Sequence, residues 1–214
     1  MMRMNVRRLI LFLGLALAQL AIAPLSSALA ADKVALVIGM SNYKTIARLD
    51  NTIGDAQEIS KTLTGLGFEV ETALDKPLAE FVDIINNFSF RAETASVALV
   101  YYAGHGVELN GQNFLIPVDV NLAKPEQINE QAITLKALLG AVEHARQLRI
   151  VILDSCRNNP FQNWPIEETA KIGDEDSSNG EVTRIRKGGL AQPSAEKGVL
   201  VVYAAKEGEV ALDG

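Results

Sequence analysis

The chain has 214 residues, the size of one or two domains, and 48% of them are hydrophobic, which is enough apolar material for one buried core. Its formal net charge is -6 at pH 7. Proteins that bind the phosphate groups of nucleic acids instead have clusters of Lys and Arg. We therefore expect no nucleic acid partner.

Residues 1–30 have the three-part layout of a secretory signal peptide. Arg3, Arg7 and Arg8 precede the apolar residues 9–18, and Ala28-Leu29-Ala30 is the small-x-small pattern that signal peptidase accepts. This pattern predicts export to the periplasm or secretion, with a mature chain that begins near Ala31 or Asp32.

The competing interpretation of this segment is a retained membrane anchor. Residues 9–29 are just long enough to span a bilayer, but Pro24, Ser26 and Ser27 interrupt their second half. We therefore favour a cleaved signal and expect no stable membrane span after its removal.

The mature sequence alternates between strand-like and helix-like segments. Short aliphatic runs predict strands covered on both faces, at residues 34–38, 68–72, 97–102, 150–153 and 199–203. Apolar residues every three or four positions predict helices over residues 53–66 and 77–88, and a third helix capped by Thr134. This order predicts one α/β domain over residues 31–214, a three-layer α/β/α sandwich around a mainly parallel sheet. The chain stops soon after its last predicted strand, so we expect this domain to lack C-terminal elements.

Two chemically active residues follow predicted strands. His105 comes after the strand at residues 97–102, and Cys156, the single cysteine, comes after the strand at residues 150–153. If these strands are neighbours, both residues emerge at the same edge of the sheet. A thiolate is a strong nucleophile and an imidazole can accept the thiol proton, so the pair predicts acyl transfer. The backbone N–H groups of Gly106 and Cys156 are candidate donors to the developing oxyanion.

The residues around both positions resemble the motifs of the caspase superfamily. Residues 99–106, Leu-Val-Tyr-Tyr-Ala-Gly-His-Gly, resemble its histidine motif, and residues 153–157, Leu-Asp-Ser-Cys-Arg, resemble its cysteine motif. The two motifs have the separation of about fifty residues that is typical of caspases. Residues 35–39, followed by Asn42-Tyr43, are similar to the start of the metacaspase and paracaspase domains, and the similarity extends from about Lys33 to Gly214.

This resemblance implies a cysteine endopeptidase in which Cys156 is the nucleophile and His105 is the general acid and base. Asp154 matches an acid that helps metacaspases and paracaspases bind arginine or lysine, which implies protein or peptide substrates with basic residues. Asp55 matches a second acid of that pocket, although a carboxylate in the first turn of a helix also complements the helix dipole. Asp213 is a further candidate for the pocket.

The resemblance also implies self-cleavage after Arg184, Arg186 or Lys187, in the connection between the two portions of the domain, although a solvated run of charged residues explains this basic segment equally well. No Cys/His cluster or Gly-rich loop indicates a metal or another cofactor, and the calcium response of some metacaspases is not indicated here. Lys206-Glu207 departs from the family pattern near the last strand. Two other functions stay open, a caspase-like interaction module without efficient catalysis and another thiol acyl-transfer enzyme such as an amidase.

Overall fold

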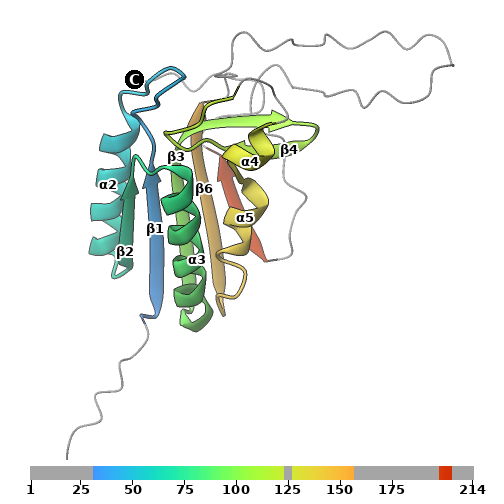
Figure 1. The fold of residues 1–214 in the computed structure, drawn as a ribbon. Coiled ribbons are helices and arrows are strands. Elements are labelled where there is room, and N and C mark those ends of the chain that lie inside the picture. The colour runs from blue at the N-terminus through green and yellow to red at the C-terminus, as the bar shows by residue number, and fades with distance from the viewer. Residues whose placement is uncertain (1–30, 123–126, 157–197, 204–214) are drawn as a thin grey trace, which may run out of the picture.

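The computed structural model describes residues 31–122, 127–156 and 198–203. Within these residues, five parallel strands lie side by side in the order β2-β1-β3-β6-β7 (Figure 1). Their bounds are β1 Lys33–Gly39, β2 Glu69–Leu74, β3 Val97–Leu109, β6 Leu148–Cys156 and β7 Val199–Tyr203. The prediction of a mainly parallel sheet is confirmed, and all five strands begin within two residues of their predicted positions. The predicted signal peptide lies outside the described residues.

Strand β3 extends beyond the parallel sheet into a small antiparallel one, which the sequence analysis did not predict. β3 pairs with β4 (Gln112–Leu115), and β4 pairs with β5 (Ile133–Thr134). Asn110 and Gly111 connect β3 to β4 with positive φ angles of 54° and 80°. Two such residues form the tight turn that suits the twist of a hairpin, and Asn-Gly is its usual sequence. The expectation that the strand ends at residue 102 is therefore wrong.

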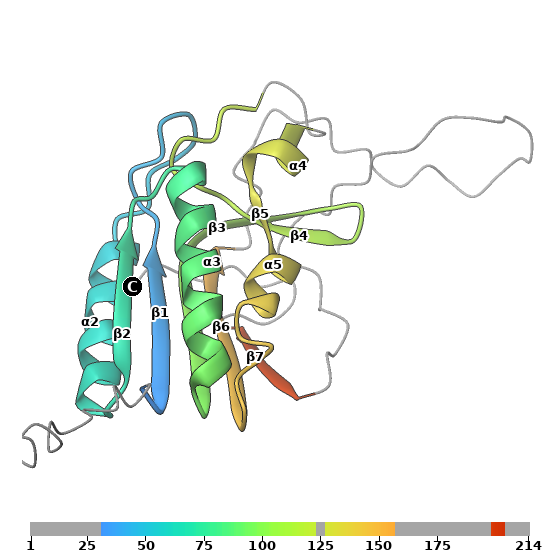
Figure 2. The same ribbon diagram turned by 60° about the horizontal axis from the view of Figure 1, so that its bottom comes forward.

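Helices cover both faces of the sheet, as the three-layer prediction requires (Figures 1 and 2). α2 (Thr52–Gly65) packs on one face, and α3 (Leu78–Thr94) and α5 (Leu135–Gly140) pack on the other, with the short α4 (Ile128–Gln131) near the antiparallel strands. The Thr134 hydroxyl accepts a hydrogen bond from the Ala137 N–H at 3.1 Å, so the predicted cap is confirmed. None of the helices in the described ranges is both long and apolar enough to cross a membrane.

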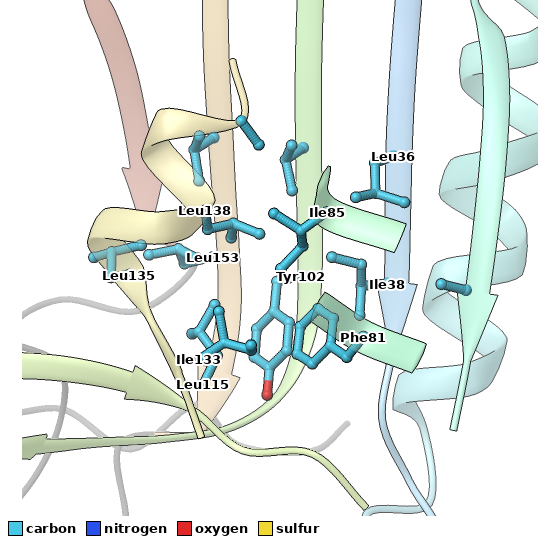
Figure 3. Close-up of a cluster of buried hydrophobic side chains, with 14 of the residues drawn as sticks. Leu36, Ile38, Phe81, Ile85, Tyr102, Leu115, Ile133, Leu135, Leu138 and Leu153 are labelled. Atoms are coloured by element: carbon cyan, nitrogen blue, oxygen red, sulfur yellow. The ribbon is translucent and has the colours of Figure 1, made fainter. Parts of the chain in front are cut away.

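The larger core lies between the sheet and the helices α3 and α5 (Figure 3). The Tyr102 ring of β3 stacks on the Phe81 ring of α3, with 6.3 Å between the ring centroids. Full burial of an apolar side chain such as Phe81 stabilises the fold by about 1.5–3 kcal/mol. The buried stripe of α3 continues past Phe88 to Ala92, which is why this helix is longer than predicted.

The second core lies between α2 and the opposite face of the sheet. Tyr101 and Leu99 of β3 pack there with Val37 of β1 and with Ala56 and Leu63 of α2. Successive residues of a strand point to opposite faces. The adjacent tyrosines Tyr101 and Tyr102 therefore reach different layers of the molecule, which decides what each hydroxyl can contact.

Candidate active site

Strands β3 and β6 are direct neighbours, and their register pairs His105 with Cys156. The same register pairs Ala103 with Asp154. Neighbouring strands lie about 4.8 Å apart, so the backbones of His105 and Cys156 are adjacent at one edge of the parallel sheet. His105 lies within β3 rather than after it, because this strand continues into the hairpin, whereas Cys156 is the last residue of β6.

The His105 ring is fixed by a backbone carbonyl. Its Nε2 atom lies 2.8 Å from the Ala47 carbonyl oxygen, in the loop between β1 and α2. A carbonyl oxygen can only accept, so Nε2 carries the hydrogen and donates it. In the neutral ring, Nδ1 then has the free lone pair. Nδ1 is buried and makes no hydrogen bond among the described residues, so the ring holds a proton acceptor ready at the strand end.

Burial also sets the protonation state of this ring. His105 is 5% exposed, and this burial lowers the pKa of its imidazole below the ordinary value of 6.5. The hydrogen bond to the Ala47 carbonyl raises the pKa and offsets part of the effect. Because desolvation disfavours the charged form, the imidazole is neutral near pH 7 and can accept a proton.

The loop that carries Ala47 also holds the His105 backbone. The Tyr43 hydroxyl accepts a hydrogen bond from the His105 N–H at 2.8 Å, and the two rings lie 4.7 Å apart between centroids. The Asp75 carboxylate anchors the start of this loop by accepting from the N–H groups of Ser41 and Asn42, at 2.7 and 3.0 Å. The Ala47 carbonyl, as a third member beside the cysteine and histidine, was not predicted, because every residue has a main-chain carbonyl and the sequence does not show which one contacts the ring.

Gly104 allows the two hydroxyls beneath His105 to approach the strand. A Cβ atom at this position would lie 2.7 Å from the Tyr102 hydroxyl oxygen and 2.8 Å from the Tyr43 hydroxyl oxygen. The Tyr102 hydroxyl donates to the His105 carbonyl at 2.7 Å. A side chain at residue 104 would therefore displace two groups that hold His105.

We expect Gly104→Ala to lower the free energy of unfolding by about 1–3 kcal/mol, the usual cost of overpacking. Thermal denaturation measures this change. Gly54→Ala is the matched control, because a Cβ at Gly54 of α2 meets no atom within 4 Å and alanine favours a helix. An unchanged melting temperature for Gly104→Ala would contradict the described contacts.

The Gly106 N–H is not used in the hairpin between β3 and β4. The hairpin register pairs Gly106 with Leu115, next to the hydrogen-bonded position where the Ile116 N–H donates to the His105 carbonyl at 3.1 Å. In an antiparallel ladder, hydrogen-bonded and non-hydrogen-bonded pairs alternate. The Gly106 N–H therefore points away from β4. Its role in binding an oxyanion stays a prediction.

Acidic residues gather on the α2 face of the same region. The Tyr101 hydroxyl donates to Asp154 Oδ2 at 2.8 Å. Burial raises the pKa of the Tyr101 hydroxyl, and so do the hydrogen bond to Asp154 and the charges of Asp154 and Asp55. Asp55 lies in the first turn of α2, as the helix-dipole interpretation expects. The fold brings both predicted pocket acids toward the ends of β3 and β6.

The other predicted positions lie outside the described residues. These are the self-cleavage positions Arg184, Arg186 and Lys187, and the additional acid Asp213. In the described part of the chain, no group of three or more His, Cys, Asp or Glu side chains is arranged to hold a metal ion.

Comparison with known proteins shows to which family this chain belongs. Residues 32–214 match the family model of the caspase domain. The chain belongs to the caspase family. The predicted resemblance to the caspase superfamily is thereby confirmed, and this family is part of the cysteine peptidase superfamily.

Curated relatives agree with this assignment. The human mucosa-associated lymphoid tissue lymphoma translocation protein 1 is 32% identical over 147 residues, which are 67% of this chain and 18% of the human protein. Its mouse homolog is 31% identical over 147 residues, 17% of its length. A paracaspase of Dictyostelium discoideum is 30% identical over 149 residues, which are 63% of this chain and 34% of that protein. The chain therefore spans about a third or less of the length of these relatives.

Proposed function

We propose that this caspase-family protein is a cysteine endopeptidase that cleaves peptide bonds after Arg or Lys. The observation that carries the proposal is the state of His105 beside Cys156. The ring is neutral, and its Nε2 donates a hydrogen bond to the Ala47 carbonyl. Its Nδ1 makes no hydrogen bond among the described residues, and His105 pairs with Cys156 in the strand register. A nucleophile needs such an oriented base within reach.

The proposed reaction proceeds through an acyl-enzyme. The Cys156 thiol gives its proton to His105 Nδ1 while its sulfur attacks the carbonyl carbon of the scissile bond. The N–H groups of Gly106 and Cys156 stabilise the oxyanion. His105 then returns the proton to the leaving amine, and the C–N bond breaks. Water, deprotonated by the same ring, attacks the thioester carbonyl carbon, the C–S bond breaks to release the carboxylic acid product, and the ring returns the proton to the sulfur.

The acidic region gives the proposed preference for basic residues. Asp154 lies two residues before Cys156, and the Asp55 charge acts on the same Tyr101 hydroxyl as the Asp154 charge. A guanidinium or ammonium group that enters this region meets two carboxylates and can form charge-assisted hydrogen bonds with them. Acidic side chains at the same subsite would be repelled.

The lowered pKa of His105 predicts the acid limb of the pH profile. Protonated His105 cannot accept the thiol proton, so kcat/KM for an arginine peptide rises with pH as the ring loses its proton. We expect the midpoint of this rise below pH 6.5, because the folded-state pKa lies below that ordinary value. The measurement is the initial rate at saturating and subsaturating peptide concentrations, at pH values on both sides of the expected midpoint. Circular dichroism at each pH shows that the protein stays folded. A midpoint at or above 6.5 would mean that His105 is not the buried base described here.

A panel of fluorogenic peptides tests the proposed function. Peptides that differ only in the residue before the reporter, Arg, Lys or Asp, are incubated with the full chain with and without calcium. We expect hydrolysis of the Arg and Lys peptides and none of the Asp peptide. No turnover of any peptide, together with no labelling by a thiol-reactive peptide electrophile, would contradict the peptidase and leave the caspase-like interaction module. Hydrolysis of the Asp peptide alone would contradict the basic specificity.

A further inference from the structure

Asp154 depends on a neighbouring strand for its orientation. It is half-buried near the end of β6, and the Tyr101 hydroxyl of β3 donates to its Oδ2 atom at 2.8 Å. The register pairs Tyr101 with Ile152, so this hydroxyl reaches along the α2 face toward the strand end to meet the carboxylate. Tyr101 itself is 4% exposed and packs in the core under α2. A rigid, buried donor thus holds one oxygen of a partly accessible acid.

We infer that Tyr101 is a positioning residue for substrate selection: its hydroxyl orients the Asp154 carboxylate toward a basic substrate side chain. This inference rests on the proposed function, because it concerns the residue preference of the same peptidase. Tyr101 does not touch the substrate in this account. It acts only through Asp154.

The chemistry of the pair supports this role. A phenol hydroxyl has one hydrogen to donate, and Asp154 Oδ2 receives it, so with respect to this bond Oδ1 and the second lone pair of Oδ2 can still accept from another donor. A guanidinium binds best when both oxygens of a carboxylate lie in a fixed plane. The hydroxyl also stays protonated across the working pH range, because burial and the two nearby carboxylates raise its pKa. The described charged groups that act on it are Asp154 and Asp55, and both are acidic.

The adjacent Tyr102 provides a built-in comparison. It points to the opposite face, where its hydroxyl donates to the His105 carbonyl at 2.7 Å. The two tyrosines of β3 therefore support different parts of the site, Tyr101 the acid and Tyr102 the backbone of the histidine. Loss of each hydroxyl should have a different kinetic signature.

The test uses the full chain and two peptide electrophiles that react with the thiol, identical except for arginine or an uncharged norleucine as the final residue. We expect Tyr101→Phe to lower the second-order labelling rate of the arginine reagent about tenfold, the size of one hydrogen bond to a charged group, and to leave the norleucine rate unchanged. With an arginine peptide substrate, KM should rise while kcat is retained. Tyr102→Phe should instead lower both labelling rates alike.

A double variant shows whether Tyr101 acts through Asp154. In an Asp154→Asn background, Tyr101→Phe should have no further effect on the ratio of the two labelling rates, since the group that it positions has lost its charge. An equal loss with both reagents, no loss with either, or a full tenfold effect in the Asp154→Asn background would overturn the inference while the peptidase stands. No labelling of the unmodified protein by either reagent would instead count against the proposed function itself.

Discussion

Replacement of Cys156 by alanine is expected to abolish hydrolysis of Arg and Lys peptides, with a loss in kcat of roughly 10⁴-fold or more. The reason is chemical, because the alanine side chain has no atom that can form the acyl-enzyme. His105→Ala should cost nearly as much, since the thiol then has no oriented base. The double variant should be no worse than either single one, because the two groups act as a unit. Initial rates with the arginine peptide measure all three.

Two controls make this result interpretable. Circular dichroism and thermal denaturation must show that each variant is folded, and each must pass through the same purification as the unmodified protein. Hydrolysis that persists at the original rate in Cys156→Ala would come from a contaminant or from another nucleophile. In either case Cys156 would not be the nucleophile that produces the measured hydrolysis.

Replacement of Asp154 by asparagine is expected to have the second large effect on the hydrolysis of arginine peptides. The amide keeps the size of the carboxylate and still accepts the Tyr101 hydrogen bond, but it loses the charge that pairs with a basic side chain. We expect kcat/KM for the arginine peptide to fall about 10- to 100-fold, as for other partly buried charge pairs, with most of the change in KM. The same peptide panel measures it, and lysine should suffer at least as much as arginine.

Asp83→Asn is the matched control for this substitution. Asp83 is exposed on α3, on the face of the sheet opposite to Asp154. Its substitution therefore changes the net charge of the protein by the same amount and leaves the acidic region unaltered. We expect it to leave kcat/KM unchanged. An equal fall in both variants would point to the overall charge of the protein, and no fall in Asp154→Asn would take this residue out of substrate binding.

Much of the fold could be predicted because the buried elements have simple patterns. Residues 34–38 and 199–203 are aliphatic runs, and both are strands of the parallel sheet. Thr134 precedes an apolar stripe, and it caps α5. These signals are local, so the sequence alone contains them. A parallel sheet brings strand ends to one edge, so His105 and Cys156 were expected together on the condition that their strands are neighbours, and the pairing of β3 with β6 meets that condition.

The features that were missed depend on contacts or on a signal that was overlooked. The continuation of β3 to Leu109 has a local signal in Asn110-Gly111, the usual sequence of a two-residue hairpin turn. The support of His105 by the Ala47 carbonyl could not be predicted, because any residue supplies the same carbonyl. The hydrogen bond from Tyr101 to Asp154 could not be predicted, because its prediction requires the strand register, and the composition of the chain does not give that register.

The most direct test of the account is an experimental structure of the protein with an arginine peptide electrophile bound to its thiol. The measured quantity is the distance between the Cys156 sulfur and His105 Nδ1, with Nε2 still on the Ala47 carbonyl. We expect roughly 3–4 Å, the range in which a nucleophile and its base exchange a proton. A ring whose Nδ1 faces away from the sulfur, or an electrophile attached elsewhere, would contradict the central claim.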